Sequence, residues 1–280
     1  MQPTFQEIKS AAKTALKHRW SEAIAATMLL LVTVSLNTVM QLVLMNIFKV
    51  DEVWSPFSPT AAPDHNQLAA AGLTLFSAAF TLFVIFPLAF GIMRWFWMIS
   101  NGCDARLSEM FGYFSSGKLF FRTIRLSLAL FFRLVLGAVV CYLPYSIVAV
   151  ITTPKVYEMF SWAFKKHVSG LIALAPTLKF LGTLGFFFWI STYILFFAVM
   201  YTESDWSVRC VIRRAVQISK GNRLRFIGFI LSFFGWLLSC LFIFPLPFVL
   251  PYVLASTAVY GREALRFARQ HDSKFAVLDV

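Results

Sequence analysis

Long runs of apolar residues alternate along the chain with shorter segments that carry most of its charge. A helix needs roughly 20 apolar residues to cross a hydrocarbon core about 30 Å thick. Backbone polar groups find no water inside that core, so runs of this length are expected to be helical. The pattern predicts an all-α, polytopic integral membrane protein with six transmembrane helices at about 23–48, 70–99, 122–151, 177–202, 224–245 and 248–266.

The last two predicted spans are joined by the proline-rich sequence "FPLPFVLPYVL". Proline lacks an amide donor and clashes inside a helix, but it is tolerated in a helix's first turn. We therefore predict a helix break at Pro245, Pro247 and Pro251 that forms a tight hairpin between two spans. A re-entrant segment that does not cross the membrane is the alternative.

Three segments share one layout, in which an amphipathic stretch and a short turn precede a span. The turns fall near His18, Gly117 and Gly221, which are about 100 residues apart. The layout predicts three hairpins, each preceded by an interfacial amphipathic helix. They would form a single membrane domain over 1–280, with candidate repeats at 1–100, 101–203 and 204–280.

The amphipathic character is clearest in the first and third copies. Ile8, Ala12 and Leu16 recur at helical spacing among lysines, and a second such stripe is formed by Val208, Val211, Ile212 and Ala215. Apolar residues at this spacing form one face of a helix. A helix divided in this way is typical of the membrane interface, where the apolar face enters the lipid.

The charge distribution predicts the orientation of the chain. The chain has 280 residues, 59% of them hydrophobic and 14% charged, with a formal net charge of +12. Of its 25 Lys and Arg residues, 19 lie in the N-terminal tail or near 94–125, 203–225 and 262–280. Positive residues favour cytoplasmic loops, so both termini are predicted to face the cytoplasm. The basic character is thereby explained by topology, and no nucleic-acid partner is required.

The sequence offers little that indicates catalysis. The four cysteines are far apart without C-x-x-C spacing, and the four histidines are scattered. No metalloprotease, hydrolase, P-loop or dinucleotide-binding signature occurs in a suitable context. We therefore predict no metal site, no cofactor and no enzymatic activity.

Arg133 is the main ionisable residue within a predicted span. A cation at this depth is costly in lipid and usually faces protein, water or a partner. Arg122, Arg125 and Arg133 fall within a sector of about 80° on one helix, so they form a stripe. This stripe is a candidate contact for a lipid phosphate or an anionic solute. Alternatively, Arg122 and Arg125 lie at the interface, while Arg133 snorkels or bonds to exposed carbonyl groups.

A second basic cluster lies in "VIRRAVQISKGNRLRFIGFIL" at 211–231. It contributes further candidate contacts for anionic lipid headgroups, namely Arg213, Arg214, Arg223 and Arg225. Alternatively, these arginines only determine the membrane topology, because they keep the beginning of the fifth span at the cytoplasmic surface.

Several stretches resemble a family of uncharacterised bacterial integral membrane proteins, domain of unknown function 975. They are "IKSAAKTALKHRWSEAI" at 8–24, "FPLAFG" at 86–91, "RRAVQISKGNRLRFIGFILSFFGWLL" at 213–238 and "PYVLASTAVY" at 251–260. The layout is also distantly similar to the membrane portion of some glycerophosphodiester phosphodiesterases. The resemblance implies a multi-pass protein of the bacterial cytoplasmic (inner) membrane and implies no reaction.

These observations favour a non-enzymatic accessory, scaffold or lipid-interacting protein with a basic cytoplasmic face. Its expected partners are the lipid bilayer, anionic lipid headgroups and a membrane-protein partner, and the oligomeric state is unknown. The alternative is a transporter or export component for an anionic or amphipathic solute, because transporter sites often lie at broken helices between repeats. A membrane enzyme acting on lipid ranks last, since no nucleophile is recognised.

Overall fold

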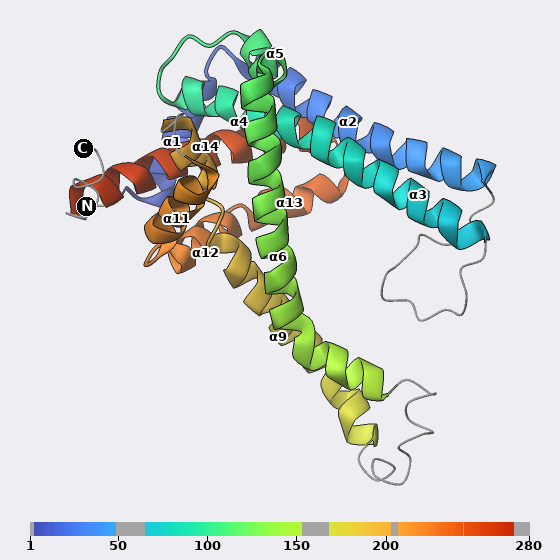
Figure 1. The fold of residues 1–280 in the computed structure, drawn as a ribbon. Coiled ribbons are helices and arrows are strands. Elements are labelled where there is room, and N and C mark those ends of the chain that lie inside the picture. Colours follow the sequence, from blue (N-terminus) through green and yellow to red (C-terminus); the bar gives the residue numbers. More distant parts are fainter. Residues whose placement is uncertain (1–2, 49–64, 153–167, 203–206, 243, 272–280) are drawn as a thin grey trace.

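The protein consists of helices that share a common body and extend from it as arms (Figure 1). This computed structural model describes residues 3–48, 65–152, 168–202, 207–242 and 244–271. Two arms diverge from the body, one formed by α2 and α3 and the other by α6 and α9. The helices are α1 (Phe5–Leu16), α2 (Trp20–Ile47), α3 (His65–Phe80), α4 (Phe86–Ser100), α5 (Gly112–Ser115), α6 (Gly117–Ile151), α9 (Val168–Ser191), α10 (Phe196–Thr202), α11 (Val208–Ser219), α12 (Arg223–Leu231), α13 (Phe234–Ser239) and α14 (Leu246–His271).

Three short elements connect or extend these helices. A π-helical turn, η1 (Thr81–Ile85), joins α3 to α4, so the two form one continuous rod. The 3-10 helix η2 (Leu107–Phe111) leads into α5, and a second 3-10 turn, η3 (Cys240–Phe242), follows α13. Within the described ranges every regular element is therefore helical, as the apolar pattern predicts.

Four helical segments are long and apolar enough to cross a membrane. They are Trp20–Ile47, Leu68–Ser100, Gly117–Ile151 and Ala173–Thr202, with 28 to 35 residues each. Large apolar side chains cover their outer surfaces; Phe132, for example, is 66% exposed. Such a surface is stable against lipid and unfavourable in water. The prediction of a polytopic, all-α membrane protein is thus confirmed in its main features.

The six-span count is not confirmed. The predicted span at 224–245 corresponds to two helical pieces, Arg223–Leu231 and Phe234–Phe242, which are bent by 45° and together form a fifth apolar segment. The predicted span at 248–266 lies within α14, which is not among the apolar segments found in the described residues. Its sequence carries Arg262, Glu263 and several hydroxyl groups, and one face of it is buried in the body.

The three prolines of the predicted helix break lie before α14, in its first turn and inside it. Pro245 precedes α14, and its carbonyl accepts the amide bonds of Phe248 and Val249 at 3.0 and 2.9 Å. Pro247 lies in the first turn, where no amide donor is needed. Pro251 lies inside α14 without ending it, although its missing amide removes one intrahelical bond.

The apolar stripes of the amphipathic helices are covered by protein. Ile8, Ala12 and Leu16 of α1 are buried, and α1 packs on α14. The stripe of α11 is buried in the same way, and this helix packs on α10. Their predicted place in the membrane interface is therefore not confirmed, because the faces expected to enter lipid are already filled by neighbouring helices.

The helices of the body contact one another in a cyclic order. At its centre α4, α10 and α14 pack against each other around buried Trp95, Phe96 and Ala258. The amphipathic elements pack on these three helices in turn: η2 and α5 on α4, α11 on α10, and α1 on α14. The contact between α1 and α14 joins the two ends of the chain and closes the ring. Three repeats would produce this arrangement, although the repeat itself stays a prediction.

Candidate functional site

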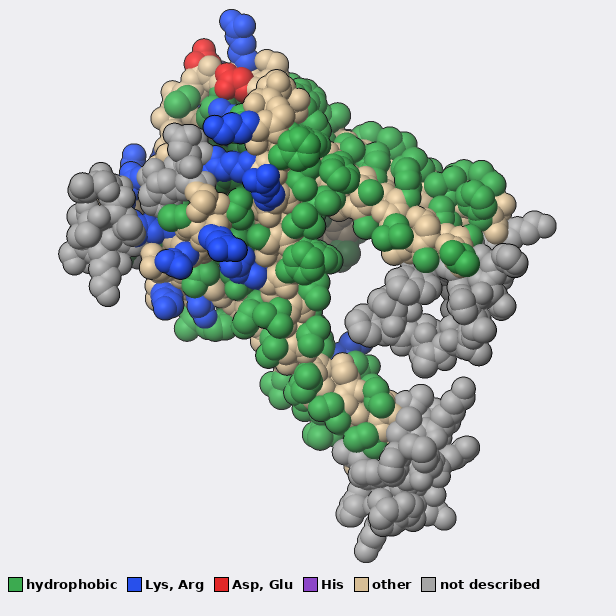
Figure 2. Space-filling model, viewed as in Figure 1, with side chains coloured by type: hydrophobic (Ala, Val, Ile, Leu, Met, Phe, Trp, Pro, Cys, Tyr) green, Lys and Arg blue, Asp and Glu red, His purple; other side chains and the backbone are tan. Residues whose placement is uncertain are grey.

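Basic side chains gather on one part of the molecule. Figure 2 shows Lys and Arg over the body around α1, α5, α11, α12 and α14, whereas the visible surfaces of the arms are largely apolar. On the described part of α9, Lys179 is an exception. Among the described residues, the body is therefore the part with most groups that could bind an anion.

A pocket of about 400 Å³ opens where α4, α10 and α14 meet. Its lining includes four arginines and no Asp or Glu among the described residues. We call it the basic pocket, and it is lined by Arg94, Trp97, Met98, Asn101, Cys103, Tyr201, Thr202, Arg262, Leu265, Arg266 and Arg269. Each of the three central helices contributes to the lining, so the pocket depends on the assembly of the whole body.

Arg262 is held in place by two contacts at the edge of the basic pocket. One of its terminal nitrogens donates to the carbonyl of Ser100, at the end of α4. Its Nε donates to Oε1 of Glu263 at 3.0 Å, and its side chain is 19% exposed. The same oxygen of Glu263 accepts from Arg266 at 3.2 Å. Glu263 thus positions two of the four arginines without lining the pocket itself.

Arg94 approaches the pocket from α4. Its guanidinium carbon lies 5.8 Å from the ring centroid of Tyr113, which belongs to α5. Burial raises the pKa of the Tyr113 phenol to about 12, and the charges of Arg94 and Arg122 oppose that rise. Tyr113 therefore stays neutral near pH 7, and its ring offers Arg94 a cation–π contact.

Three other polar side chains of the pocket have backbone partners. The Tyr201 hydroxyl donates to the carbonyl of Phe90 at 2.7 Å, and the Asn101 amide donates to that of Trp97 at 2.8 Å. The Thr202 hydroxyl donates to its own helix. These bonds fix the walls of the pocket, so the guanidinium groups are its main donors for a ligand.

A second groove lies on the other side of Arg262. It has a volume of about 490 Å³ and shares Arg262 and Cys103 with the basic pocket. Arg19 lines it and is paired with Asp104, while also donating to the carbonyl of Ala105 at 3.2 Å. With an arginine already bound to a carboxylate, this groove is a weaker anion site than the basic pocket.

The arginine stripe predicted on α6 lies outside both cavities. Arg122 is half-buried and Arg125 is exposed near the beginning of the helix. Arg133 is half-buried and donates to the carbonyl of Ala129, one turn earlier, at 3.4 Å. Its own carbonyl accepts from the Trp189 indole at 3.1 Å, where α9 packs on α6. The structure thus places Arg133 at a helix–helix contact with a bond to its own backbone.

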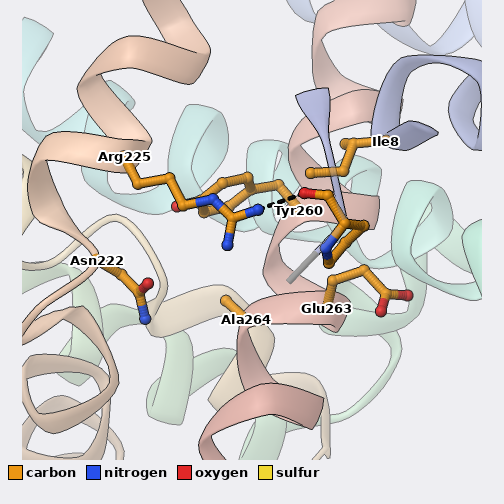
Figure 3. A pocket seen from close by; sticks show the side chains of 7 residues that line it. Ile8, Asn222, Arg225, Tyr260, Glu263 and Ala264 are labelled. Atoms are coloured by element: carbon orange, nitrogen blue, oxygen red, sulfur yellow. Dashed lines mark hydrogen bonds between the residues drawn. The ribbon is translucent and has the colours of Figure 1, made fainter. Parts of the chain in front are cut away.

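The four arginines predicted on α11 and α12 are not brought together as a site. Arg213 is exposed, whereas Arg214 is 6% exposed. Arg223 lies over the ring of Phe188, 5.2 Å from its centroid. Arg225 donates to the carbonyl of Pro3 beside a cavity of about 10 Å³ (Figure 3). Three of the four are therefore occupied in packing, and Arg213 remains available to an external anion.

Sequence reasoning missed the arginines of the basic pocket. Arg262, Arg266 and Arg269 follow one another at spacings of four and three residues, which places them on one face of a helix. Arg94 stands within the aromatic run "MRWFWM". The helical spacing was a usable signal, but the meeting of the two segments depends on the packing of α4 on α14.

Within the described ranges, no group of three or more His, Cys, Asp or Glu side chains is placed to hold a metal ion. The sequence prediction of no metal site and no cofactor is not tested by that finding and stays a prediction.

Comparison with known families finds one that covers nearly the whole chain. A family model described as "Protein of unknown function (DUF975)" matches residues 1–266. Neither the curated proteins nor the solved structures yield a match. The distant likeness to the membrane portion of glycerophosphodiester phosphodiesterases is not shown by these comparisons.

Proposed function

The chain belongs to the DUF975 family, whose molecular function is unknown, and on that premise we propose that it is a non-enzymatic, lipid-interacting membrane scaffold. The observation that carries the proposal is the separation of a basic body from apolar arms (Figure 2). Anionic lipid attracts surface Lys and Arg with about 1 kcal/mol per residue. A body of this charge at a membrane surface would collect anionic headgroups.

We further propose that the body faces the cytoplasm of a bacterial inner membrane, with both termini on that side. In support, α1, the start of α6 and the end of α14 all belong to the body, and these segments carry Lys and Arg. Positive residues are retained on the cytoplasmic side during insertion. The arms would then extend through the bilayer toward the opposite surface.

We also propose that the membrane contains three hairpins and six crossings, of which the third hairpin is the shortest. Its first half would be the bent pair Arg223–Phe242 and its second half α14. The cyclic contacts support this, because α14 occupies the same kind of central position as α4 and α10. The more polar sequence of α14 is tolerated where it packs on protein instead of lipid.

Lipid selectivity of the full-length protein tests the scaffold proposal. The protein would be reconstituted in phosphatidylcholine containing a trace of spin-labelled lipid, and the motionally restricted fraction measured. Labelled phosphatidylglycerol should associate at least twofold more strongly than labelled phosphatidylcholine at low salt. The preference should disappear near 1 M salt, where the Debye length falls to about 3 Å. Equal association of the two lipids at low salt would refute the proposal.

Variants that remove charge from the body or from an arm locate the effect. Arg209, Arg213 and Lys220 are exposed on or next to α11, so the R209Q/R213Q/K220Q variant should lose much of the preference without loss of packing. Lys179 lies on the arm, and K179Q should retain it. If K179Q lowers the preference as much as the α11 variant, the basic body is not the source of selectivity.

The transporter alternative gains no specific support. The centre of the body is filled by Trp95, Phe96 and Val199, all buried. Arg133 lines neither of the two cavities at the body. A transport pathway through the centre of the body would need these side chains to move apart.

A further inference from the structure

We propose that the basic pocket binds a phosphate monoester, carried either by a lipid headgroup or by a soluble phosphoester. This inference rests on the scaffold proposal and deepens it, because it gives the basic body one specific ligand class. The pocket was not predicted from the sequence, and it differs from the exposed cations of α11 in being concave and shared by three helices.

The charge of the pocket suits a dianion. Four guanidinium groups line it, and among the described residues the carboxylate of Glu263 pairs with two of them, Arg262 and Arg266. These five groups carry a net charge of about +3 at neutral pH, because arginine is always protonated. A phosphate monoester carries about −1.5 to −2 at pH 7, whereas a phosphodiester or a carboxylate carries about −1. The monoester therefore gains the largest electrostatic stabilisation.

The arrangement of donors also suits a tetrahedral group. Arginine donates through a planar fork that matches two oxygens of a phosphate at once. Arg94 comes from α4 while Arg262, Arg266 and Arg269 come from α14, so the donors approach from two helices. A carboxylate presents two oxygens in one plane and is satisfied by one fork. A monoester presents three terminal oxygens and can accept from several arginines together.

Arg262 is pre-organised for this role. Two of its five N–H donors are used by the Ser100 carbonyl and the Glu263 carboxylate. The remaining donors are held in a fixed orientation, so binding would cost less side-chain entropy than at a free surface arginine. Arg266 is 63% exposed but shares the same carboxylate, which keeps it near the opening of the pocket.

The basic pocket is large enough to hold more than the phosphate group, and part of its lining is apolar. A volume of about 400 Å³ is within the range of ordinary ligand pockets. Trp97, Met98 and Leu265 provide an apolar wall beside the arginines. A glycerol ester or another small organic group attached to the phosphate could contact that wall, in a lipid or in a soluble molecule.

The test measures binding of a fluorescent short-chain phosphatidate to the full-length protein in a neutral detergent, by fluorescence anisotropy. Phosphatidate is a phosphate monoester, and short-chain phosphatidylglycerol serves as the diester of the same lipid class. We expect the monoester to bind at least tenfold more tightly. Equal affinity for the two lipids would overturn the proposal.

Two double variants with the same change of charge locate the binding. Arg266 and Arg269 are exposed at the end of α14, and Lys17 and Lys118 are exposed next to α1 and at the start of α6 and line neither cavity, so neither pair is needed for the core. R266Q/R269Q should weaken phosphatidate binding at least tenfold, since charge-assisted bonds are lost. K17Q/K118Q should weaken it less than threefold. Equal losses would show a general charge effect and overturn the assignment.

Competition distinguishes the two sources of the phosphate. If glycerol 3-phosphate and inorganic phosphate displace the probe at submillimolar concentration, the ligand is a soluble phosphoester. If only phosphatidate competes at that concentration, the ligand is a lipid headgroup. Both results support a monoester site. No displacement by any monoester, unlabelled phosphatidate included, contradicts it.

Cys103 gives an independent readout, because it is exposed and lies where the basic pocket and the second groove meet. In a C141S/C210S/C240S background, a neutral maleimide should modify Cys103 at least threefold more slowly when phosphatidate is bound. An unchanged rate at saturating ligand would contradict binding at this place. The scaffold proposal can survive that result, because general selectivity for anionic lipid is measured separately by the spin-label experiment.

Discussion

Two turn residues have the same backbone conformation with very different side chains. His18 has a φ of 68° between α1 and α2, and Gly221 has a φ of 87° between α11 and α12. Each stands fourteen positions after its helix's N-cap, Thr4 or Ser207. The left-handed region costs an ordinary residue about 1 kcal/mol or more, whereas glycine adopts it freely.

Exchange of these residues should therefore change stability in opposite directions. H18G should raise the free energy of unfolding by about 1 kcal/mol, and G221A should lower it by about the same amount. Lys17 is in the same turn with a φ of −57°, so K17G is the control and should not stabilise. The measurement is unfolding by sodium dodecyl sulfate in mixed micelles. The explanation fails if H18G is no more stable than K17G.

The contacts of individual arginines could not be predicted from the sequence. The cationic character of the body could be predicted because charge and apolar pattern are properties of the sequence. The role of each arginine could not: Arg213 faces outward, while Arg225 donates to Pro3 from more than 200 residues away. Contacts of that kind depend on tertiary packing, which the spacing of residues along a helix does not determine.

For whole helices, too, the sequence predicts some properties, while others depend on tertiary packing. The four long spans were predictable because an apolar run of sufficient length has few other stable states than a membrane helix. The amphipathic segments were predictable as helices, but the surfaces that cover their apolar faces were not. An apolar stripe is satisfied equally by lipid or by a protein surface, and in α1 and α11 the protein provides it.

The turn of the third hairpin can show whether that hairpin crosses the membrane. Phe244 lies at the turn between η3 and α14 and is 83% exposed. If the hairpin crosses the membrane, a cysteine at 244 should react with a membrane-impermeant maleimide added to spheroplasts. A re-entrant segment would leave it unreactive until the membrane is opened. Cys240 lies nearby, so F244C is made in a C240S background.

Controls for this experiment come from the same chain. A cysteine replacing exposed Lys220 belongs to the basic body and should react only after permeabilisation. Reaction of both positions from outside would contradict the proposed orientation. Protection of position 244 in intact spheroplasts, with reaction after opening, would instead establish the re-entrant alternative and reduce the number of crossings.

The whole molecule is closed by contacts between its first and last hairpins. Lys9 donates to the carbonyl of Ser232 at 2.8 Å and lies over the ring of Phe233, 4.2 Å from its centroid. Arg225 donates to Pro3 (Figure 3), and α1 packs along α14. Because α1 links the two ends of the chain, its docking should stabilise the third hairpin as well as the N-terminus.

A single enlarged side chain at this contact tests the coupling. Ala12 is fully buried, so A12L should overpack the site and destabilise the protein by about 1–3 kcal/mol. Gln6 is exposed on the same helix, and Q6L is the control with a change below about 0.5 kcal/mol. Limited trypsin digestion of the folded protein in detergent gives the long-range readout, at the Lys220–Gly221 bond in the turn between α11 and α12.

If the ring closes through α1, A12L should accelerate cleavage after Lys220 as well as cleavage within the first nineteen residues. The reason is that undocking of α1 also releases the bonds made by Lys9 and Arg225, which hold α12. If α1 were an independent appendage, only the N-terminal cleavages would become faster. That outcome would show that the third hairpin and the basic pocket at the end of α14 are assembled without the N-terminal helix.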